Sequence, residues 1–254
     1  HSSHRRQRQM CIRDSITVAS GKSFTVEKTG SVTISGNFSN AGTFTLNSDS
    51  DEFSSIIIGG SVTGNITYNR YVNPVGSNEW DLIGSPVDLL SISTFATNSS
   101  TLATNGSAYA IGEYNNFTDT WTNYTTSNIG SSGNFDIGKG YQMGSIGSGS
   151  GILVFTGSPT STNQTQSIIN NNAANSGAGR RWNLVANPFP SYIQGNTNAH
   201  SNNNFLTVNS DKLDDSYEAI YGYDADGSGY TIYNHSSSTL RLAPGQAFMV
   251  ASDN

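Results

Sequence analysis

The chain has 254 residues, of which only 12% are charged, and its formal net charge is −6. An acidic chain lacks the basic face that neutralises phosphates, which argues against a nucleic-acid partner. It contains no run of 18 apolar residues, so no membrane span is predicted. Ser, Thr, Asn and Gly supply most of its polar surface, and these residues favour strands and turns over long helices. The composition therefore predicts an all-β protein.

Residues 1–15 differ sharply in character from the rest of the chain. They hold four arginines, the only cysteine and two of the four histidines. Residues 9–15 (QMCIRDS) resemble a translated sequencing adaptor of the kind found at the ends of metagenomic fragments. A basic targeting segment is the alternative, but the apolar stretch of a secretory signal is missing. We therefore expect residues 1–15 to be a non-native or disordered tail.

Residues 16–72 alternate apolar and polar residues, and Gly or Asn interrupts the pattern every few residues. Alternation with a period of two places the apolar side chains on one face of each strand. The strands are short and the turns between them are very short. Such a ladder fits a small β-solenoid or a meander, and we favour the solenoid.

Two later stretches are diverged copies of one another. Residues 80–87 (WDLIGSPV) return as 182–189 (WNLVANPF), and residues 138–143 (GKGYQM) return as 245–250 (GQAFMV). Between these motifs the aromatic residues also recur: Tyr114, Trp121 and Tyr124 correspond to Tyr223, Tyr230 and Tyr233. A repeat of this length is a structural unit rather than a short solenoid period.

We expect copy one over residues 73–158, a linker over 159–179 and copy two over 180–254. Each Trp motif predicts a buried strand, with Trp80 and Trp182 in the core. Residues 109–124 and 219–233 predict hairpins, and each Gly motif predicts a turn that leads into a core strand at Tyr141 or Phe248. Helix is expected to be minimal, with one turn within residues 205–213.

The two copies fit two small β-sandwiches or one jelly-roll-like sandwich. We favour a single composite unit, because each copy alone is poor in apolar residues. The strand predicted at residues 151–157 has no counterpart in copy two. We therefore expect that the chain is truncated at both ends and that copy two has an open sheet edge.

Residues 64–71 (GNITYNRY), both Trp motifs and residues 243–248 (APGQAF) resemble large surface proteins of Bacteroidota. Members of that family typically carry a C-terminal sorting domain for type IX secretion, which this sequence lacks. The resemblance covers nearly everything from residue 15 to residue 254. It implies an extracellular or outer cell-surface location, and it carries over no catalytic residue.

Nucleophilic catalysis finds no support in the sequence. Beyond residue 15 there is no cysteine and no G-x-S-x-G motif, and the two histidines, His200 and His235, lie in Asn- and Ser-rich stretches. We expect both to be solvated loop residues. The acidic residues lie mostly in predicted turns, which does not favour a carboxylate pair for sugar hydrolysis.

A calcium site is a sharper hypothesis. Asp224, Asp226 and Ser228 present alternate oxygens next to a glycine, as hard-cation loops do. The later bidentate Glu is missing, and copy one has no Asp at the corresponding hairpin turn. We favour a plain turn and expect no cofactor.

Tyr114, Trp121 and Tyr124 are the remaining candidates, because aromatic faces with polar neighbours suit sugar rings. Their recurrence in copy two favours packing instead. Our leading hypothesis is a non-enzymatic extracellular module that serves as a structural or adhesin-like scaffold. The alternative is a carbohydrate-binding module attached to a polysaccharide-degrading enzyme, with a polysaccharide or cell-surface glycan as its partner. The discriminating feature is whether Trp121 and Tyr124 are exposed side by side. The oligomeric state stays open.

Overall fold

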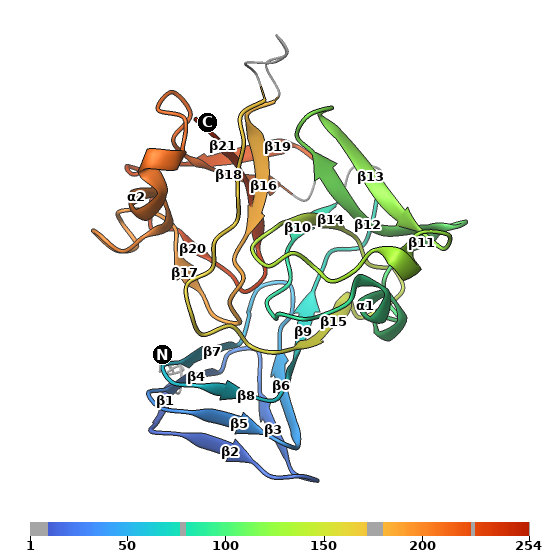
Figure 1. Ribbon diagram of the computed structural model, residues 1–254, viewed down its shortest axis with the longest axis vertical. Coiled ribbons are helices and arrows are strands. Elements are labelled where there is room, and N and C mark those ends of the chain that lie inside the picture. Colours follow the sequence, from blue (N-terminus) through green and yellow to red (C-terminus); the bar gives the residue numbers. More distant parts are fainter. Residues whose placement is uncertain (1–9, 77–79, 172–179, 225–226, 254) are drawn as a thin grey trace, which may run out of the picture.

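The computed structural model describes residues 10–76, 80–171, 180–224 and 227–253. In this part of the chain, strands form most of the regular structure and the helices are short. The predicted all-β class is confirmed. A coil of short strands forms one end of the molecule, and the two copies of the repeat lie side by side on it (Figure 1).

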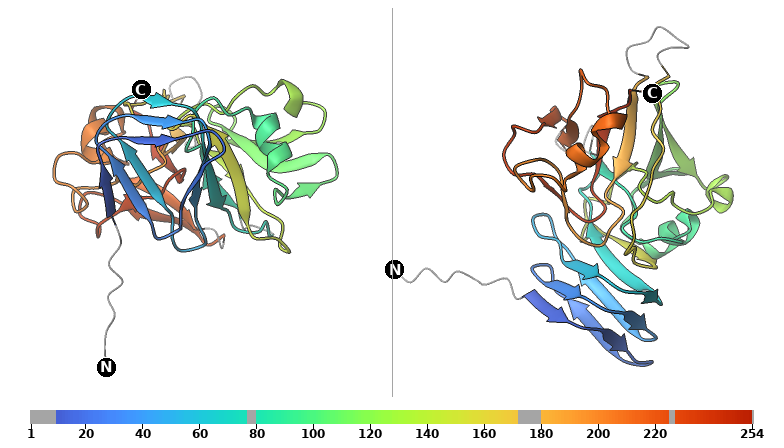
Figure 2. Two further views of the ribbon diagram at one scale, coloured as in Figure 1. Left: turned by 90° about the horizontal axis from the view of Figure 1, so that it is seen from below. Right: turned by 60° about the vertical axis from the view of Figure 1, so that its left-hand side comes forward.

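The N-terminal coil pairs each strand in parallel with the strand three positions further on (Figure 2). This gives the parallel series β1-β4-β7, β2-β5-β8 and β3-β6-β9. A meander would instead pair strands that are adjacent in the chain, in antiparallel fashion. The nine strands are β1 (Met10–Arg13), β2 (Ile16–Val18), β3 (Ser23–Val26), β4 (Ser31–Ile34), β5 (Phe38–Asn40), β6 (Thr43–Asn47), β7 (Ser55–Ile58), β8 (Val62–Thr63) and β9 (Ile66–Tyr71).

The alternating sequence pattern explains the interior of the coil. Every second side chain of β4 and β9 is buried, because successive residues of a strand point to opposite faces. Inside, the rings of Phe38 and Phe44 meet edge to face, with centroids 5.1 Å apart. The corner before β9 requires glycine: Gly64 has φ +88°, and a Cβ there would lie 2.0 Å from the carbonyl oxygen of Asn40.

Four residues of the expected tail belong to this coil. Strand β1 pairs with β4, from Met10 opposite Ser31 to Arg13 opposite Ile34. The expectation of disorder is therefore wrong for residues 10–13, because the parallel ladder gives their backbone groups partners. Residues 1–9 lie outside the described residues, and the resemblance to an adaptor stays a prediction.

The two copies build sheets with the same strand order. Copy one has β10 (Asp81–Ile83), β14 (Tyr141–Met143), β12 (Ala108–Asn115) and β13 (Thr120–Thr125), with the short β11 (Thr104–Asn105) beside β12. Copy two has β16 (Trp182–Ala186), β21 (Ala247–Ala251), β18 (Ile220–Asp224) and β19 (Gly229–Tyr233). The registers also agree, since Tyr114 lies opposite Trp121 in copy one and Tyr223 lies opposite Tyr230 in copy two. The repeat in the sequence is therefore a repeat of structure.

The copies meet in reciprocal contacts. Ile83 of copy one forms a β-bridge with Gln246 of copy two, and Lys139 of copy one forms a β-bridge with Val185 of copy two. In the repeat, Ile83 corresponds to Val185 and Lys139 to Gln246, so each copy offers the same surface to the other. This is the pattern of a local two-fold axis. The space between the sheets is filled by Leu82, Leu184, Ala186, Ala247 and Met249.

The strand at the end of copy one, β15 (Ile152–Gly157), belongs to the coil. It runs antiparallel to β9, from Ile152 opposite Tyr71 to Gly157 opposite Ile66. The expectation that copy two has an open edge for lack of this strand is therefore wrong, because the sheet of copy one does not contain it either. Two further short strands, β17 (Ile193–Gln194) and β20 (Arg241–Leu242), pair with each other.

Helices are short. The turn expected within residues 205–213 is present as α2 (Phe205–Asn209) and the 3-10 turn Ser210–Lys212. We did not predict α1 (Ile92–Asn98), which is capped by Ser91, or the 3-10 turn Ile129–Ser131. None of the helices in the described part of the chain has the length and apolar character needed to cross a membrane.

Candidate functional site

A cavity of about 340 Å³ lies where the hairpin of copy one, β12–β13, approaches the sheet of copy two. Its lining consists of five aromatic residues, one methionine and one acid: Tyr114, Trp121, Trp182, Tyr221, Tyr230, Met249 and Asp119. We call it the aromatic cavity. Each hairpin supplies two rings, and one ring of each pair, Trp121 in copy one and Tyr230 in copy two, holds an equivalent position in the repeat.

Tyr114 and Trp121 form one wall of the aromatic cavity. They are cross-strand partners and share a face of the hairpin, with ring centroids 5.1 Å apart. Trp121 keeps 36% of its surface exposed, and Tyr230 keeps 44%. The prediction that these recurring aromatic residues are packing residues is therefore wrong for Trp121 and Tyr230. Their rings remain accessible to a ligand.

Tyr124 does not join this wall. It follows Trp121 by three residues in β13, and side chains at that spacing point to opposite faces of a strand. Tyr124 packs against the main core, and its hydroxyl donates a hydrogen bond to Oε1 of Glu113. Burial, and then this hydrogen bond, raise the pKa of Tyr124. Of the three predicted binding residues, the structure brings Tyr114 and Trp121 together and separates Tyr124 from them. Trp121 and Tyr124 are therefore not exposed side by side, so the feature named above for a carbohydrate-binding module is not found at that pair.

Asp119 supplies the carboxylate of the aromatic cavity. It lies in the turn of the hairpin with φ +55°, a left-handed conformation that Asn and Asp tolerate better than most residues. Its Oδ1 accepts a hydrogen bond from the hydroxyl of Tyr114 at 2.8 Å. Burial, and then this hydrogen bond, raise the pKa of Tyr114, so the phenol stays protonated and directs its proton to Asp119.

Trp182 forms the opposite wall. It packs edge to face against Tyr221, with ring centroids 4.6 Å apart. Its backbone carbonyl accepts a hydrogen bond from the side-chain amide of Asn116 at 2.6 Å, which ties the hairpin of copy one to copy two. Trp182 and Trp80 are partly buried, and Trp182 packs against the apolar cluster between the sheets, so Trp182 lies at the edge of the core rather than inside it. Tyr141 and Phe248, predicted with them, are fully buried.

Five residues of the aromatic cavity were not predicted as site residues: Asp119, Trp182, Tyr221, Tyr230 and Met249. The equivalence of Trp121 and Tyr230 in the repeat was a signal that could have added Tyr230 to the predicted site. The sequence does not show that the two equivalent hairpins approach one another.

A protein-family model matches residues 5–254, which is nearly the whole chain. The chain belongs to the DUF8693 family. The description of that family is a domain of unknown function, and no curated protein and no solved structure matches the chain. Membership in DUF8693 therefore spans the coil and both copies, and function has to be argued from the site itself.

The calcium hypothesis concerns the turn between β18 and β19 of this DUF8693 domain. The carboxylate of Asp224 accepts a hydrogen bond from the hydroxyl of Thr231, at 3.0 and 3.1 Å, and its backbone carbonyl accepts one from Gly227 at 2.9 Å. Ser228 lies in the same turn, and Asp226 lies outside the described residues. Among the residues that the structure describes, no group of three His, Cys, Asp or Glu side chains could hold a metal. These contacts are those of a hairpin turn, and calcium binding stays a prediction.

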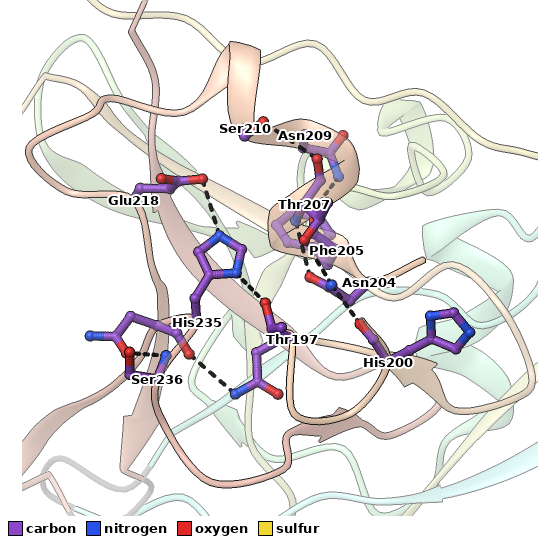
Figure 3. Close-up of polar contacts among 12 residues, drawn as sticks. Thr197, His200, Asn204, Phe205, Thr207, Asn209, Ser210, Glu218, His235 and Ser236 are labelled. Carbon is purple, nitrogen blue, oxygen red and sulfur yellow. Dashed lines mark hydrogen bonds and ion pairs between the residues drawn. The ribbon is translucent and has the colours of Figure 1, made fainter. Parts of the chain in front are cut away.

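His235 is held between two side chains (Figure 3). Its Nδ1 lies 2.6 Å from Oγ1 of Thr197, and its Nε2 lies 3.3 Å from Oε1 of Glu218. His235 lies in a loop, as expected, and 38% of its side chain is exposed, but both ring nitrogens have side-chain partners. A hydroxyl, an imidazole and a carboxylate are also the components of a catalytic triad. In a triad, however, the carboxylate contacts Nδ1 and the hydroxyl contacts Nε2, which is the reverse of the order here.

The surroundings of His235 explain its contacts as a link between loops. The side-chain amide of Asn196 donates to the carbonyls of Asn234, Ser237 and Ser238 at 2.9 to 3.2 Å. The contact between Thr197 and His235 adds one more link to this network. None of Thr197, Glu218 and His235 lines the aromatic cavity.

His200 is exposed, as expected for a solvated loop residue. Its Nδ1 accepts a hydrogen bond from the backbone amide of Asn203 at 2.9 Å. Asn204, which follows Asn203, caps α2: its Oδ1 accepts a hydrogen bond from the backbone amide of Thr207 at 3.0 Å. His200 therefore shapes the loop that begins α2 (Figure 3).

Proposed function

We propose that this chain is a non-enzymatic extracellular module of a secreted or cell-surface bacterial protein, and that it binds carbohydrate in the aromatic cavity. The exposed rings of Trp121 and Tyr230, which border one cavity from two copies, support this proposal most directly. Aromatic rings offer an apolar face to the C–H groups of a sugar, and a few polar groups at the rim fix its orientation.

A second cavity lies at the hairpin of copy one, where Glu113, Asn115 and Thr122 point to the face opposite Tyr114 and Trp121. It also measures about 340 Å³, and its lining is mostly polar: Glu113, Tyr114, Asn115, Asn116, Phe117, Thr122 and Asn171. Tyr114 lines both cavities. A ligand of several sugar units would pass Tyr114 at the edge of the hairpin to reach the second cavity, where amide groups can bond its hydroxyls. We therefore propose an oligosaccharide or polysaccharide rather than a single sugar as the ligand.

The extracellular location rests on composition and resemblance. Low charge and abundant Ser, Thr and Asn accompany the likeness of the Trp motifs to type IX-secreted surface proteins of Bacteroidota. A carbohydrate-binding module of this kind would be attached to a polysaccharide-degrading enzyme and hold it on its substrate. The extracellular location and the attachment to such an enzyme are both part of the proposal.

A structural role as a stalk or adhesin-like scaffold is the second candidate. The contacts between the coil and copy two favour it, because they join the two parts firmly. The Nε of Arg70 in the coil donates to the carbonyl of Pro244 at 2.9 Å, and the amide of Ile56 donates to that of Pro190 at 2.8 Å. A scaffold without a ligand would use these contacts and leave the aromatic cavity empty.

A glycan-array screen of the full chain distinguishes the two candidates. We expect binding by the wild type, loss of binding in Trp121→Ala, and retained binding in Phe24→Ala. The two variants form a matched pair, because Phe24 in the coil is as exposed as Trp121, at 37% and 36%, and lines neither cavity. Absence of binding by a wild-type protein with a cooperative unfolding transition would leave only the scaffold role. Equal loss in both variants would show that the aromatic cavity is not the site.

A further inference from the structure

The aromatic cavity combines ring faces with a single acid. Of the described residues that line it, five are aromatic and Asp119 is the only charged one. The face of an aromatic ring carries partial negative charge and attracts a cation within about 6 Å of the ring centroid. A neutral sugar would use the rings, but it gives no role to the negative charge of Asp119.

We propose that the ligand of the aromatic cavity carries a positive charge, and that it is a sugar with an ammonium group, as in a deacetylated amino sugar. This proposal rests on the proposed carbohydrate-binding function and narrows its ligand class. The sugar ring stacks on Trp121, and the ammonium group lies between Asp119 and the rings of the other wall.

The repeat does not require an acid at position 119. The corresponding residue of copy two is Ser228, which occupies the same place before the second strand of its hairpin. The hairpin therefore forms with or without the carboxylate. In addition, Asp119 has a left-handed backbone with φ +55°. A backbone in this conformation usually persists only where the surrounding structure holds it. The hydroxyl of Tyr114 fixes the carboxylate, at 2.8 Å.

Asp119 of copy one and Tyr230 of copy two line the same cavity. Burial is the main cause that raises the pKa of Tyr230, followed by the neighbouring Tyr223 and then by the charge of Asp119. A cation placed between these residues would meet the carboxylate on one side and an aromatic face on the other. Both attractions favour a positive ligand over a neutral one.

Three positive side chains lie near the hairpin of copy one. Lys139 lies 3.1 Å from Oε2 of Glu113, and Arg181 forms an ion pair with Asp214. The guanidinium carbon of Arg180 lies 4.8 Å from the ring centroid of Phe117. None of the three lines the aromatic cavity. The charge of Asp119 is therefore available to a ligand that brings its own cation.

The test measures binding of two oligosaccharides of equal length to the full chain by titration calorimetry. One is an oligomer of glucosamine, at a pH where its amines are protonated, and the other is the oligomer of N-acetylglucosamine. We expect the wild type to bind the glucosamine oligomer about five times more tightly, as one exposed charge pair provides. Raising the pH until the amines lose their protons should remove this difference.

Two variants assign the preference to Asp119. Asp119→Asn keeps the shape and the tolerance of the left-handed conformation but removes the charge, so it should bind both oligomers equally. Trp121→Ala should bind neither. A thermal transition equal to that of the wild type serves as the control for folding in each variant.

The outcomes separate this proposal from the proposed function. Equal affinity of the wild type for both oligomers would overturn the cation proposal and leave carbohydrate binding intact. A preference that survives in Asp119→Asn would also overturn it. If neither oligomer binds and the glycan array is silent, both proposals fail together. Tighter binding of free choline than of either oligomer would replace the amino sugar with a quaternary ammonium headgroup.

Discussion

The backbone amide of Gly84 donates a hydrogen bond to the carbonyl of Gly245 at 2.8 Å, and the amide of Ala186 donates to the carbonyl of Gly138, also at 2.8 Å. In the repeat, Gly84 corresponds to Ala186 and Gly245 corresponds to Gly138. The two copies therefore touch through the same atoms in both directions, as the subunits of a two-fold dimer do. Duplication has placed within one chain an interface of a kind that otherwise joins two chains.

Gly84 of copy one lies against Ala186, the equivalent residue of copy two. A Cβ on Gly84 would lie 2.3 Å from Cβ of Ala186 and 2.7 Å from the carbonyl oxygen of Lys139. We expect Gly84→Ala to lower the free energy of unfolding by about 1–3 kcal/mol, the usual cost of overpacking. Urea unfolding followed by circular dichroism measures this loss.

The reverse change in copy two provides the control. Adding Ala186→Gly to Gly84→Ala removes the clash between the two Cβ atoms, so the double variant should recover part of the lost stability. Ala186→Gly alone is measured to complete the cycle. If the two changes are simply additive, residues 84 and 186 do not contact one another as described.

Trp182 offers a second test of the packing between copies. Because the ring is half-buried, we expect Trp182→Ala to lower the free energy of unfolding by about 2 kcal/mol, below the range of about 3–5 kcal/mol for a fully buried aromatic residue. Phe248, which is 0% exposed, provides the reference, and Phe248→Ala should fall in that range. Equal losses in the two variants would contradict the partial exposure of Trp182.

The strands and the repeat follow from local features of the sequence. Alternation in residues 31–34 predicts that Val32 and Ile34 are buried, and both are. Helix α1 does not follow, because its residues are mostly β-branched or polar and have modest helix propensity. Its stability comes from tertiary packing, in which the rings of Phe95 and Phe155 lie 4.5 Å apart. Such a contact between distant residues leaves no local pattern.

The site divides in the same way. Tyr114 and Trp121 were candidates by residue type, and the spacing of Trp121 and Tyr124 already places them on opposite faces of a strand. That Trp182 and Tyr230 complete the aromatic cavity depends on how the two copies meet. Nothing in either copy alone encodes that contact, so sequence reasoning could name only two of the seven residues that line the cavity.

Arg70 joins the coil to copy two. Its side chain is buried, with 5% of its surface exposed, and its guanidinium carbon lies 4.0 Å from the ring centroid of Phe53. Its Nε donates to the carbonyl of Pro244 at 2.9 Å, and its Nη1 donates to the carbonyl of Tyr71. We expect Arg70→Lys to lower the free energy of unfolding by about 2–4 kcal/mol, because an ammonium group cannot replace a planar donor that also stacks.

Chemical denaturation of Arg70→Lys beside Arg241→Lys isolates this effect. Arg241 is exposed, and its substitution should change the free energy of unfolding by no more than about 0.5 kcal/mol. A small effect at both positions would mean that Arg70 does not hold the coil to copy two.

Two buried phenols should make the protein sensitive to alkali. Burial is the main cause that raises the pKa of Tyr68 and of Tyr141 above the ordinary tyrosine value of about 10. The Tyr68 hydroxyl donates to the carbonyl of Ser54 at 2.6 Å, and the Tyr141 hydroxyl accepts the amide of Asp136 at 3.1 Å. Below pH of about 10, both phenols are protonated in the folded and the unfolded state, so neither makes stability depend on pH.

Above that pH only the unfolded chain releases these protons. The free energy of unfolding should then fall as the pH rises, by about 1.4 kcal/mol per pH unit for each phenol that stays protonated in the folded state. Urea unfolding at a series of pH values above 10 measures the slope. Tyr141→Phe is the matched variant, because copy two has Phe248 at the equivalent position. In this variant the free energy of unfolding should fall less steeply with pH, by about 1.4 kcal/mol per pH unit, because one phenol is missing. Identical slopes in the variant and the wild type would show that Tyr141 ionises as freely in the folded protein as in the unfolded chain.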